Sequence, residues 1–149
     1  MGALALDFDA VLGDTRPLWR AWLEDVARRA RVEIELPEDR AAAAHALDGA
    51  LGNWPALLER FAEDRAPVHL RPSAEVNAAL RRLADDGVRL GAFTDAPEPL
   101  ARVAAAQLGV ARRLDALEVG AGALERLLER LGPATRVVRS RSELAEAAR

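Results

Sequence analysis

The feature of this sequence that most constrains its fold is an alternation of short apolar segments with segments of helical periodicity. A first apolar run at residues 3–8 is followed by a stretch with helical patterns only, and from residue 70 onward the two patterns alternate. We expect strands at 3–8, 88–93, 114–119 and 135–139, and helices at 17–30, 38–51, 54–64, 74–85, 98–108, 123–131 and from 142 onward. Strands that alternate with helices in this way predict an α/β fold with a parallel sheet.

The first strand also indicates where functional side chains should lie. Residues 3–6 are apolar without alternation, which is typical of a strand buried on both faces of a helix-covered sheet. In such sheets, ligands bind beyond the carboxyl ends of the strands. We expect Ser73 to cap the helix at 74–85 and Gly109 to end the helix at 98–108.

Composition excludes several kinds of site and partner. The chain of 149 residues is 50% apolar and 30% charged, as in one globular domain, and it has no Cys, which excludes disulfides, thiolate metal sites and a cysteine nucleophile. All 21 basic residues are Arg, which we interpret as a trace of genome composition, and any mechanism that needs a lysine amine is excluded. The net charge of −3 predicts neither a nucleic acid nor a membrane surface as partner. The first apolar run is too short for a signal peptide or membrane span, so we expect a cytoplasmic protein.

Two acidic residues lie at the end of the first apolar run. Asp7 and Asp9 are two positions apart, so in an extended strand their side chains lie on the same face. Two neighbouring carboxyls in different surroundings can divide into an ionised nucleophile or metal ligand and a proton carrier. Asp residues also end strands and begin turns, so the pair alone fits a structural role as well.

A second polar junction follows the strand expected at 88–93. Thr94 and Asp95 come directly before Ala96-Pro97 and the next helix. A hydroxyl and free backbone N–H groups at a strand-to-helix junction are the donors that a phosphoryl oxygen needs. We therefore expect Thr94 and Asp95 to form a phosphate-binding group.

These segments together resemble the haloacid dehalogenase-like superfamily, and most of all its phosphoglycolate-phosphatase-like branch. The residues that carry the resemblance are ALDFDAVLGDT at 5–15, LRP at 70–72 and GVRLGAFTD at 87–95. The resemblance implies a modified Rossmann-type parallel sheet, with a core of residues 1–13 and 71–149. It also implies a helical cap at 14–70, inserted after the first strand.

The resemblance further implies a phosphatase that acts on a small phosphorylated metabolite. Asp7 would attack the phosphorus to form an aspartyl-phosphate, and Asp9 would protonate the leaving oxygen and later deprotonate water. Mg²⁺ would be held by Asp7, by the backbone carbonyl of Asp9 and by an acid after the fourth strand, for which Glu143 is the candidate. Thr94 would bind the phosphoryl group.

The sequence also departs from the family's pattern. Residues 120–123, where the family has a Lys, read Gly-Ala-Gly-Ala, and the segment after the fourth strand offers Arg139 and Arg141 with Glu143 as its one acid. Arg139 is a candidate phosphate ligand because guanidinium groups bind phosphate oxygens in pairs, and its alternative is a solvent-exposed position.

Two functions therefore stay open. One is a Mg²⁺-dependent phosphatase, and the other is a catalytically degenerate relative that binds a phosphorylated ligand or a protein partner without turnover. A third interpretation, an interaction module that uses the apolar surface of the cap, has no specific support, and nothing in the sequence indicates an oligomeric state. His45 and His69 are interpreted as structural or surface residues, and the three tryptophans Trp19, Trp22 and Trp54 as the core of the cap.

Overall fold

The fold is built on a parallel sheet, as the alternation predicted. The computed structural model describes residues 2–30 and 35–149. In this part of the chain the strands are β1 (Ala3–Asp7), β2 (Arg89–Thr94), β3 (Ala116–Val119) and β4 (Thr135–Val138), in the order β3-β2-β1-β4. Each pair is parallel, and Asp7 at the end of β1 lies beside Phe93 in β2. The carboxyl ends of β1 and β2 therefore meet at the middle of one edge of the sheet.

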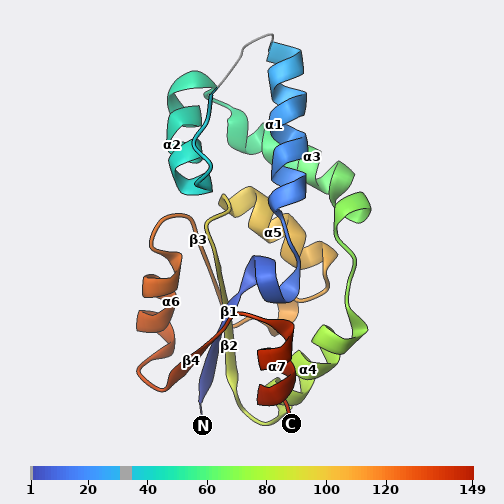
Figure 1. Ribbon diagram of the computed structural model, residues 1–149, viewed down its shortest axis with the longest axis vertical. Helices are drawn as coiled ribbons and strands as arrows, with labels where there is room; N and C mark the ends of the chain where they lie inside the picture. Colours follow the sequence, from blue (N-terminus) through green and yellow to red (C-terminus); the bar gives the residue numbers. More distant parts are fainter. Residues whose placement is uncertain (1, 31–34) are drawn as a thin grey trace.

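Helices cover both faces of this sheet (Figure 1). In the described residues, the α-helices between β1 and β2 are α1 (Arg16–Ala30), α2 (Arg40–Ala50), α3 (Trp54–His69) and α4 (Ala74–Asp85). Helices α5 (Glu98–Gln107), α6 (Ala123–Leu131) and α7 (Arg141–Ala147) follow β2, β3 and β4 respectively. Helix α6 packs on one face, where Leu127 and Leu131 meet Ala3 and Ala5 of β1. The other face packs against α4, α5 and α7 through a larger cluster that includes Leu4 and Leu6. Successive residues of β1 thus serve opposite cores, which confirms that this strand is buried on both faces.

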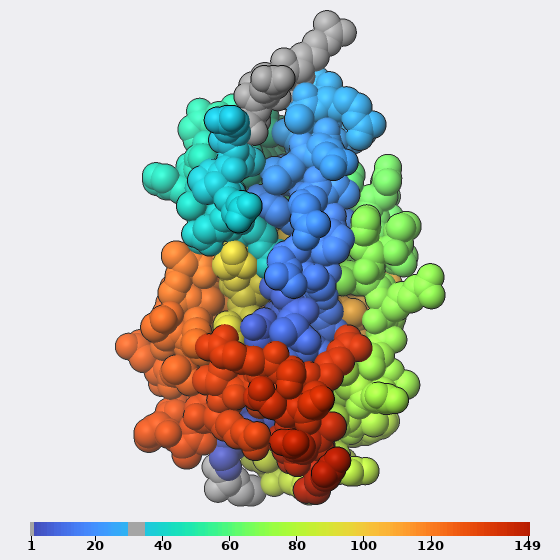
Figure 2. All heavy atoms as spheres, in the orientation of Figure 1, coloured from blue at the N-terminus to red at the C-terminus, as the bar shows by residue number. Residues whose placement is uncertain are grey.

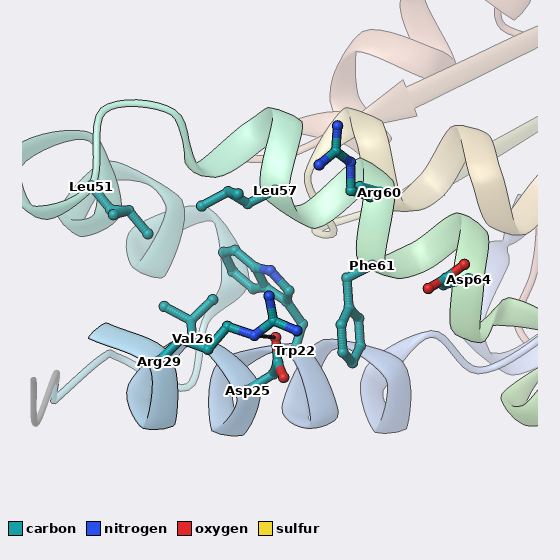
Figure 3. A pocket seen from close by; sticks show the side chains of 9 residues that line it. All are labelled: Trp22, Asp25, Val26, Arg29, Leu51, Leu57, Arg60, Phe61 and Asp64. Atoms are coloured by element: carbon teal, nitrogen blue, oxygen red, sulfur yellow. Dashed lines mark ion pairs between the residues drawn. The ribbon is translucent and has the colours of Figure 1, made fainter. Parts of the chain in front are cut away.

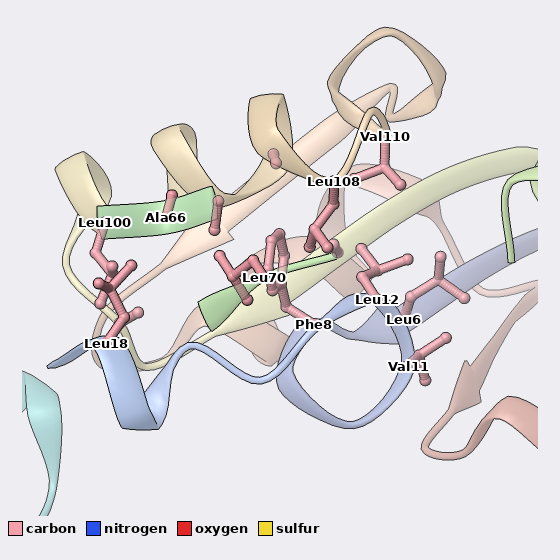
Figure 4. Packing of buried hydrophobic residues seen from close by; sticks show 14 of the residues in the cluster. Leu6, Phe8, Val11, Leu12, Leu18, Ala66, Leu70, Leu100, Leu108 and Val110 are labelled. Atoms are coloured by element: carbon pink, nitrogen blue, oxygen red, sulfur yellow. The ribbon is translucent and has the colours of Figure 1, made fainter. Parts of the chain in front are cut away.

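Helices α1 to α3, called the helical layer below, lie above the carboxyl edge of the sheet (Figure 1). Its interior holds three tryptophans, with ring centroids of Trp19 and Trp22 at 5.3 Å and of Trp22 and Trp54 at 6.1 Å. The layer meets the sheet domain through buried side chains of α1, α3 and α5, among them Leu18, Ala66 and Leu100 (Figure 4). In the space-filling view the atoms of α1 and α2 form the upper part of the molecule and those of α6 and α7 cover the lower front (Figure 2). The division of the chain into a core at 1–13 and 71–149 and a cap at 14–70 stays a prediction.

Several element bounds differ from the sequence expectations by one or two residues, among them the starts of α2 and β3, and three further differences concern helical segments. Helix α3 continues to His69 through Pro67, beyond the expected end at residue 64, because Ala62 and Ala66 remain on its buried face and packing outweighs the preference of proline to end a helix. Residues Phe8–Leu12 form a π-helical turn that the sequence did not indicate. The last helix begins at Arg141, since Ser140 accepts a hydrogen bond from the backbone N–H of Glu143 at 3.1 Å and caps it.

None of the helices in the described residues has both the length and the apolar composition that crossing a membrane requires. This finding concerns the described helices alone.

The packing of α6 on the sheet leaves no room for a side chain at Gly91 of β2. A Cβ atom added there would lie 2.5 Å from Leu127 Cδ1 and 3.0 Å from Leu131 Cδ1. We predict that Gly91→Val lowers the free energy of unfolding by about 1–3 kcal/mol through overpacking against α6. Gly49→Ala is the matched control, because no atom lies within 4 Å of a Cβ there, and it should raise stability by about 0.5–1 kcal/mol in helix α2. Urea unfolding measures both, and an unchanged midpoint for Gly91→Val would refute the packing of α6 on β2.

Candidate active site

The acidic and hydroxyl side chains predicted to act together come together at the carboxyl ends of β1 and β2. A cavity of about 270 Å³ opens there. It is lined by Asp7, Asp9, Phe93, Thr94, Asp95, Gly120, Ala123 and Leu124. The two strands are neighbours in the sheet, so a segment near residue 8 and a segment near residue 94 meet across one edge.

Asp7 is the more open of the two acids. Its side chain is 28% exposed, and among the described residues the one hydrogen bond it accepts comes from the backbone N–H of Ala10 at 3.3 Å. That bond caps the π-helical turn, which the N–H of Gly13 closes on the carbonyl of Phe8 at 3.0 Å. The turn buries Phe8, Val11 and Leu12 and leaves the Asp7 carboxylate facing the cavity. Asp7 therefore has oxygen lone pairs available for a ligand.

Asp9 is in the opposite situation. Its Oδ1 accepts hydrogen bonds from the backbone N–H of Thr15 at 2.8 Å and from the Thr15 hydroxyl at 2.5 Å. Its Oδ2 accepts the hydroxyl of Thr94 at 2.8 Å and Nη2 of Arg40 at 2.7 Å. The side chain is 12% exposed. Both carboxylate oxygens of Asp9 are thus held by the chain itself.

Arg40, at the start of helix α2, is the site residue that the sequence analysis missed. Its side chain is 3% exposed and donates from Nη1 to the Thr15 hydroxyl at 2.6 Å and from Nη2 to Thr94 Oγ1 at 3.3 Å. Its Nε and Nη2 donate to Asp95 Oδ1 at 3.0 and 2.8 Å. One signal was present in the sequence: Arg40 stands three and seven residues before Ala43 and Leu47, on the buried face of α2. A charged residue in an apolar stripe needs a buried partner.

The same arginine sets the protonation of Asp95. Burial by itself would raise the pKa of the Asp95 carboxyl, but the hydrogen bond and the charge of Arg40 outweigh it and hold that pKa below its ordinary value. The backbone N–H of Arg40 adds a further bond to Asp95 Oδ2 at 3.2 Å. Asp95 is therefore an ionised partner of Arg40, and its predicted role as a phosphate ligand stays a prediction.

Arg139 and Glu143 lie on the β4 side of the site. The Arg139 side chain is 57% exposed, with its guanidinium carbon 5.6 Å from the centroid of Phe93 and its Nη1 4.0 Å from Asp7 Oδ2. Arg139 is thus exposed to solvent and also close to Asp7, and its predicted role as a phosphate ligand stays a prediction. Glu143 Oε2 accepts the backbone N–H of Arg139 at 3.3 Å. Arg141 Nε donates a hydrogen bond to the carbonyl of Val11 in the π-helical turn at 3.0 Å.

The oxygen atoms at this edge do not form the ligand set expected for Mg²⁺. No three Asp, Glu, His or Cys side chains within residues 2–30 and 35–149 form a group that could hold a metal ion. Both carboxylate oxygens of Asp9 accept hydrogen bonds, so the Asp9 side chain offers no free ligand, whereas the expected ligand from this residue is its backbone carbonyl. Mg²⁺ binding by Asp7, by the backbone carbonyl of Asp9 and by Glu143 stays a prediction.

A separate cavity of about 320 Å³ lies within the helical layer, between α1 and α3 (Figure 3). Trp22, Val26 and Phe61 line it, and Asp25 pairs with Arg29 at its rim with Nε and Oδ2 3.3 Å apart. None of the residues predicted to be functional lies in it.

Comparisons with known proteins support the fold. No family model matches the chain, and no curated protein does. A crystal structure described as a "putative beta-phosphoglucomutase from Thermotoga maritima" superposes with a TM-score of 0.58 at 21% identity, over 99% of this chain and 82% of that one. Together with the parallel sheet, the likeness shows an α/β Rossmann-like fold.

The ion pair between Arg40 and Asp95 makes stability depend on pH. The folded-state pKa of Asp95 is lowered, so the carboxylate stabilises the fold fully above the unfolded-state value of about 3.9 and loses this effect as the pH falls through the folded-state value. We predict that acidification from about pH 6 to pH 3 lowers the Tm of the wild type more than that of Asp95→Asn. Thermal unfolding followed by circular dichroism at several pH values measures the difference. Equal slopes for the two proteins would contradict this assignment.

Proposed function

We propose that the protein binds a small phosphate monoester at the carboxyl ends of β1 and β2 and hydrolyses it through a phosphoryl group on Asp7. The observation that carries this proposal is the different state of the two acids. Asp7 faces the cavity with free lone pairs, whereas Asp9, two residues later, is hydrogen-bonded on both oxygens. One carboxylate is thus free to act as a nucleophile and the other is positioned for a different role.

The proposed chemistry has two steps. In the first, a carboxylate oxygen of Asp7 forms a bond to phosphorus while the bond to the ester oxygen breaks, and protonated Asp9 gives its proton to the leaving oxygen. In the second, water attacks the phosphorus, Asp9 takes the proton of the water, and the bond between phosphorus and Asp7 breaks to release inorganic phosphate. Because both oxygens of Asp9 are hydrogen-bonded, its side chain has to give up a contact with Arg40 or Thr94 before it reaches the leaving oxygen.

Arginine side chains and the Thr94 hydroxyl are the groups available to bind the phosphoryl oxygens. Arg139 lies at the Asp7 side of the cavity, and Thr94 lies at the end of β2. Guanidinium groups pair well with phosphate oxygens, which supports Arg139 as a phosphate ligand. The loss of one preorganised charged or hydrogen-bonding group at such a site costs about 100- to 1,000-fold in rate, so we propose slow turnover for a chain that has no lysine.

The ligand class is inferred from the structural neighbour. The Thermotoga maritima protein bears the name of an enzyme of a phosphorylated glucose, which supports a small phosphorylated metabolite as ligand here. In this proposal residues 14–70 act as a cap that admits the organic part of the ligand. Mg²⁺ dependence and a cytoplasmic location stay predictions from the sequence.

A second function is favoured by one observation, the bonds between Arg40 and Asp9. If these bonds are permanent, Asp9 never reaches a leaving group, and the protein binds a phosphorylated ligand without turnover. The two functions share the cavity at Asp7 and differ in the fate of the bound ester.

We predict that Asp7→Asn abolishes hydrolysis, because an amide is not a nucleophile toward phosphorus. The rate on an aryl phosphate, with and without Mg²⁺, should fall at least about 1,000-fold to background. Asp14→Asn is the matched control, since Asp14 pairs with Arg16 outside the cavity and its loss should leave the rate unchanged. A wild-type rate no higher than that of Asp7→Asn would refute the phosphatase proposal.

The function without turnover has its own test. Inorganic phosphate and an unhydrolysed aryl phosphate should bind to the wild type in calorimetry, and Thr94→Val should weaken binding about tenfold, since one hydrogen bond to a charged group contributes about 1.5 kcal/mol. Binding that is unchanged in Thr94→Val would place the ligand elsewhere.

A further inference from the structure

Three polar or charged side chains are fully buried in the described part of the chain, and all three lie in one cluster. They are Thr15, Arg40 and Thr94, and each is at most 4% exposed. Arg40 is the charged member, and it comes from the helical layer, whereas Thr94 ends a strand of the sheet. A buried arginine is stable only with oxygen partners that satisfy its donors.

Oxygen atoms surround the guanidinium on several sides. They are Asp9 Oδ2 at 2.7 Å, Asp95 Oδ1 at 2.8 Å, Thr15 Oγ1 at 2.6 Å and Thr94 Oγ1 at 3.3 Å from its nearest nitrogens. Two carboxylates and two hydroxyls form a set of hard oxygen donors of the kind that divalent cations such as Mg²⁺ and Ca²⁺ use. Here the chain's own cation lies among them.

The charges of the cluster explain why a cation is needed there. Asp9 and Asp95 both bond to one nitrogen, Arg40 Nη2, so the two carboxylates lie close together. Two like charges so close together repel each other, and a cation between them offsets this repulsion. Arg40 leaves the three side chains with one net negative charge, whereas its removal would leave two negative charges without a counterion.

Arg40 also lies between two cavities. A second cavity of about 490 Å³ opens on the side of the helical layer, and Trp19, Arg20, Leu36, Arg40 and Asp95 are among the residues that line it. Asp95 lines the cavity at Asp7 as well. The pair of Arg40 and Asp95 is therefore part of the wall between the two cavities, and solvent reaches this wall from both sides.

We propose that the Arg40 guanidinium is the resident cation of this site, in the position among Asp9, Asp95, Thr15 and Thr94 that an exchangeable divalent cation would otherwise take. The wild-type protein then binds no divalent cation at these four oxygens. Removal of the guanidinium turns the same oxygens into a divalent-cation site, because both cavities admit the ion and two carboxylates remain without a counterion. This inference rests on the surroundings of Arg40 and does not require hydrolysis.

The test compares Mn²⁺ binding by calorimetry and the Tm in about 10 mM Mg²⁺ for matched variants. Arg40→Met keeps the length of the side chain and removes its charge, and Arg20→Met is the control, because Arg20 lines the second cavity without bonding the carboxylates. The wild type and Arg20→Met should show no Mn²⁺ binding that depends on Asp95, so Asp95→Asn should leave their Mn²⁺ binding and the response of their Tm to Mg²⁺ unchanged. Arg40→Met should melt lower, bind one Mn²⁺, and regain at least about 2 °C in Mg²⁺. In Arg40→Met/Asp95→Asn the response to the ion should be lost.

Other results would overturn the proposal. One is a wild type that binds Mn²⁺ as tightly as Arg40→Met and loses the ion in Asp95→Asn, which would put an exchangeable site beside Arg40. Another is a folded Arg40→Met variant that binds no Mn²⁺ and whose Tm does not change in Mg²⁺. If Arg40→Met is unfolded in a chelator, recovery of its near-ultraviolet tryptophan signal in about 10 mM Mg²⁺ is the expected result, and no recovery overturns the proposal. None of these readouts depends on turnover, so a failure here and a failure of the phosphatase proposal are distinguishable.

Discussion

The arrangement of the site depends on the burial of one charge, the guanidinium of Arg40. Placing a cation inside a protein is unfavourable unless oxygen atoms replace its water, and Asp9, Asp95 and two hydroxyls do so here. Because Arg40 begins helix α2 while Asp95 follows β2, the same bonds connect the helical layer to the carboxyl edge of the sheet. Any movement of α2 away from the sheet would expose these charges together, so the position of the helix and the electrostatics of the site are coupled.

Two carboxylates only two residues apart acquire different surroundings because the chain turns between them. Asp7 is still in β1 and points into the cavity, whereas Asp9 lies in the π-helical turn and reaches Thr15 and Thr94. Arg141 contacts two carbonyls of that turn, so the start of α7 helps to hold it in place. Separate roles for the two acids, which the proposed chemistry needs, thus follow from backbone geometry.

The sequence predicted those parts of the structure that depend on local patterns. Apolar runs and helical periodicity identified the strands and helices, and the rule that ligands bind beyond the carboxyl ends of parallel strands indicated the edge where Asp7 and Thr94 lie. Arg40 was missed because its partners lie 25 to 55 residues away in the sequence, and only its place on the apolar face of α2 distinguishes it among 21 arginines. The end of α3 was expected at residue 64 instead of His69 for a related reason, since the packing of α3 on α5 outweighs the local preference of Pro67 to end a helix.

At residue 40, an arginine and a lysine would not be interchangeable. An ammonium group is a compact point charge with three donors, whereas a guanidinium presents five donors in a planar fork. Arg40 uses that fork to bond two carboxylates and two hydroxyls from three segments of the chain, which a lysine at residue 40 would not span. Genome composition is our interpretation of why the other 20 basic residues are arginine. At residue 40, the geometry of the four oxygen partners would select arginine even in a chain where lysine were common.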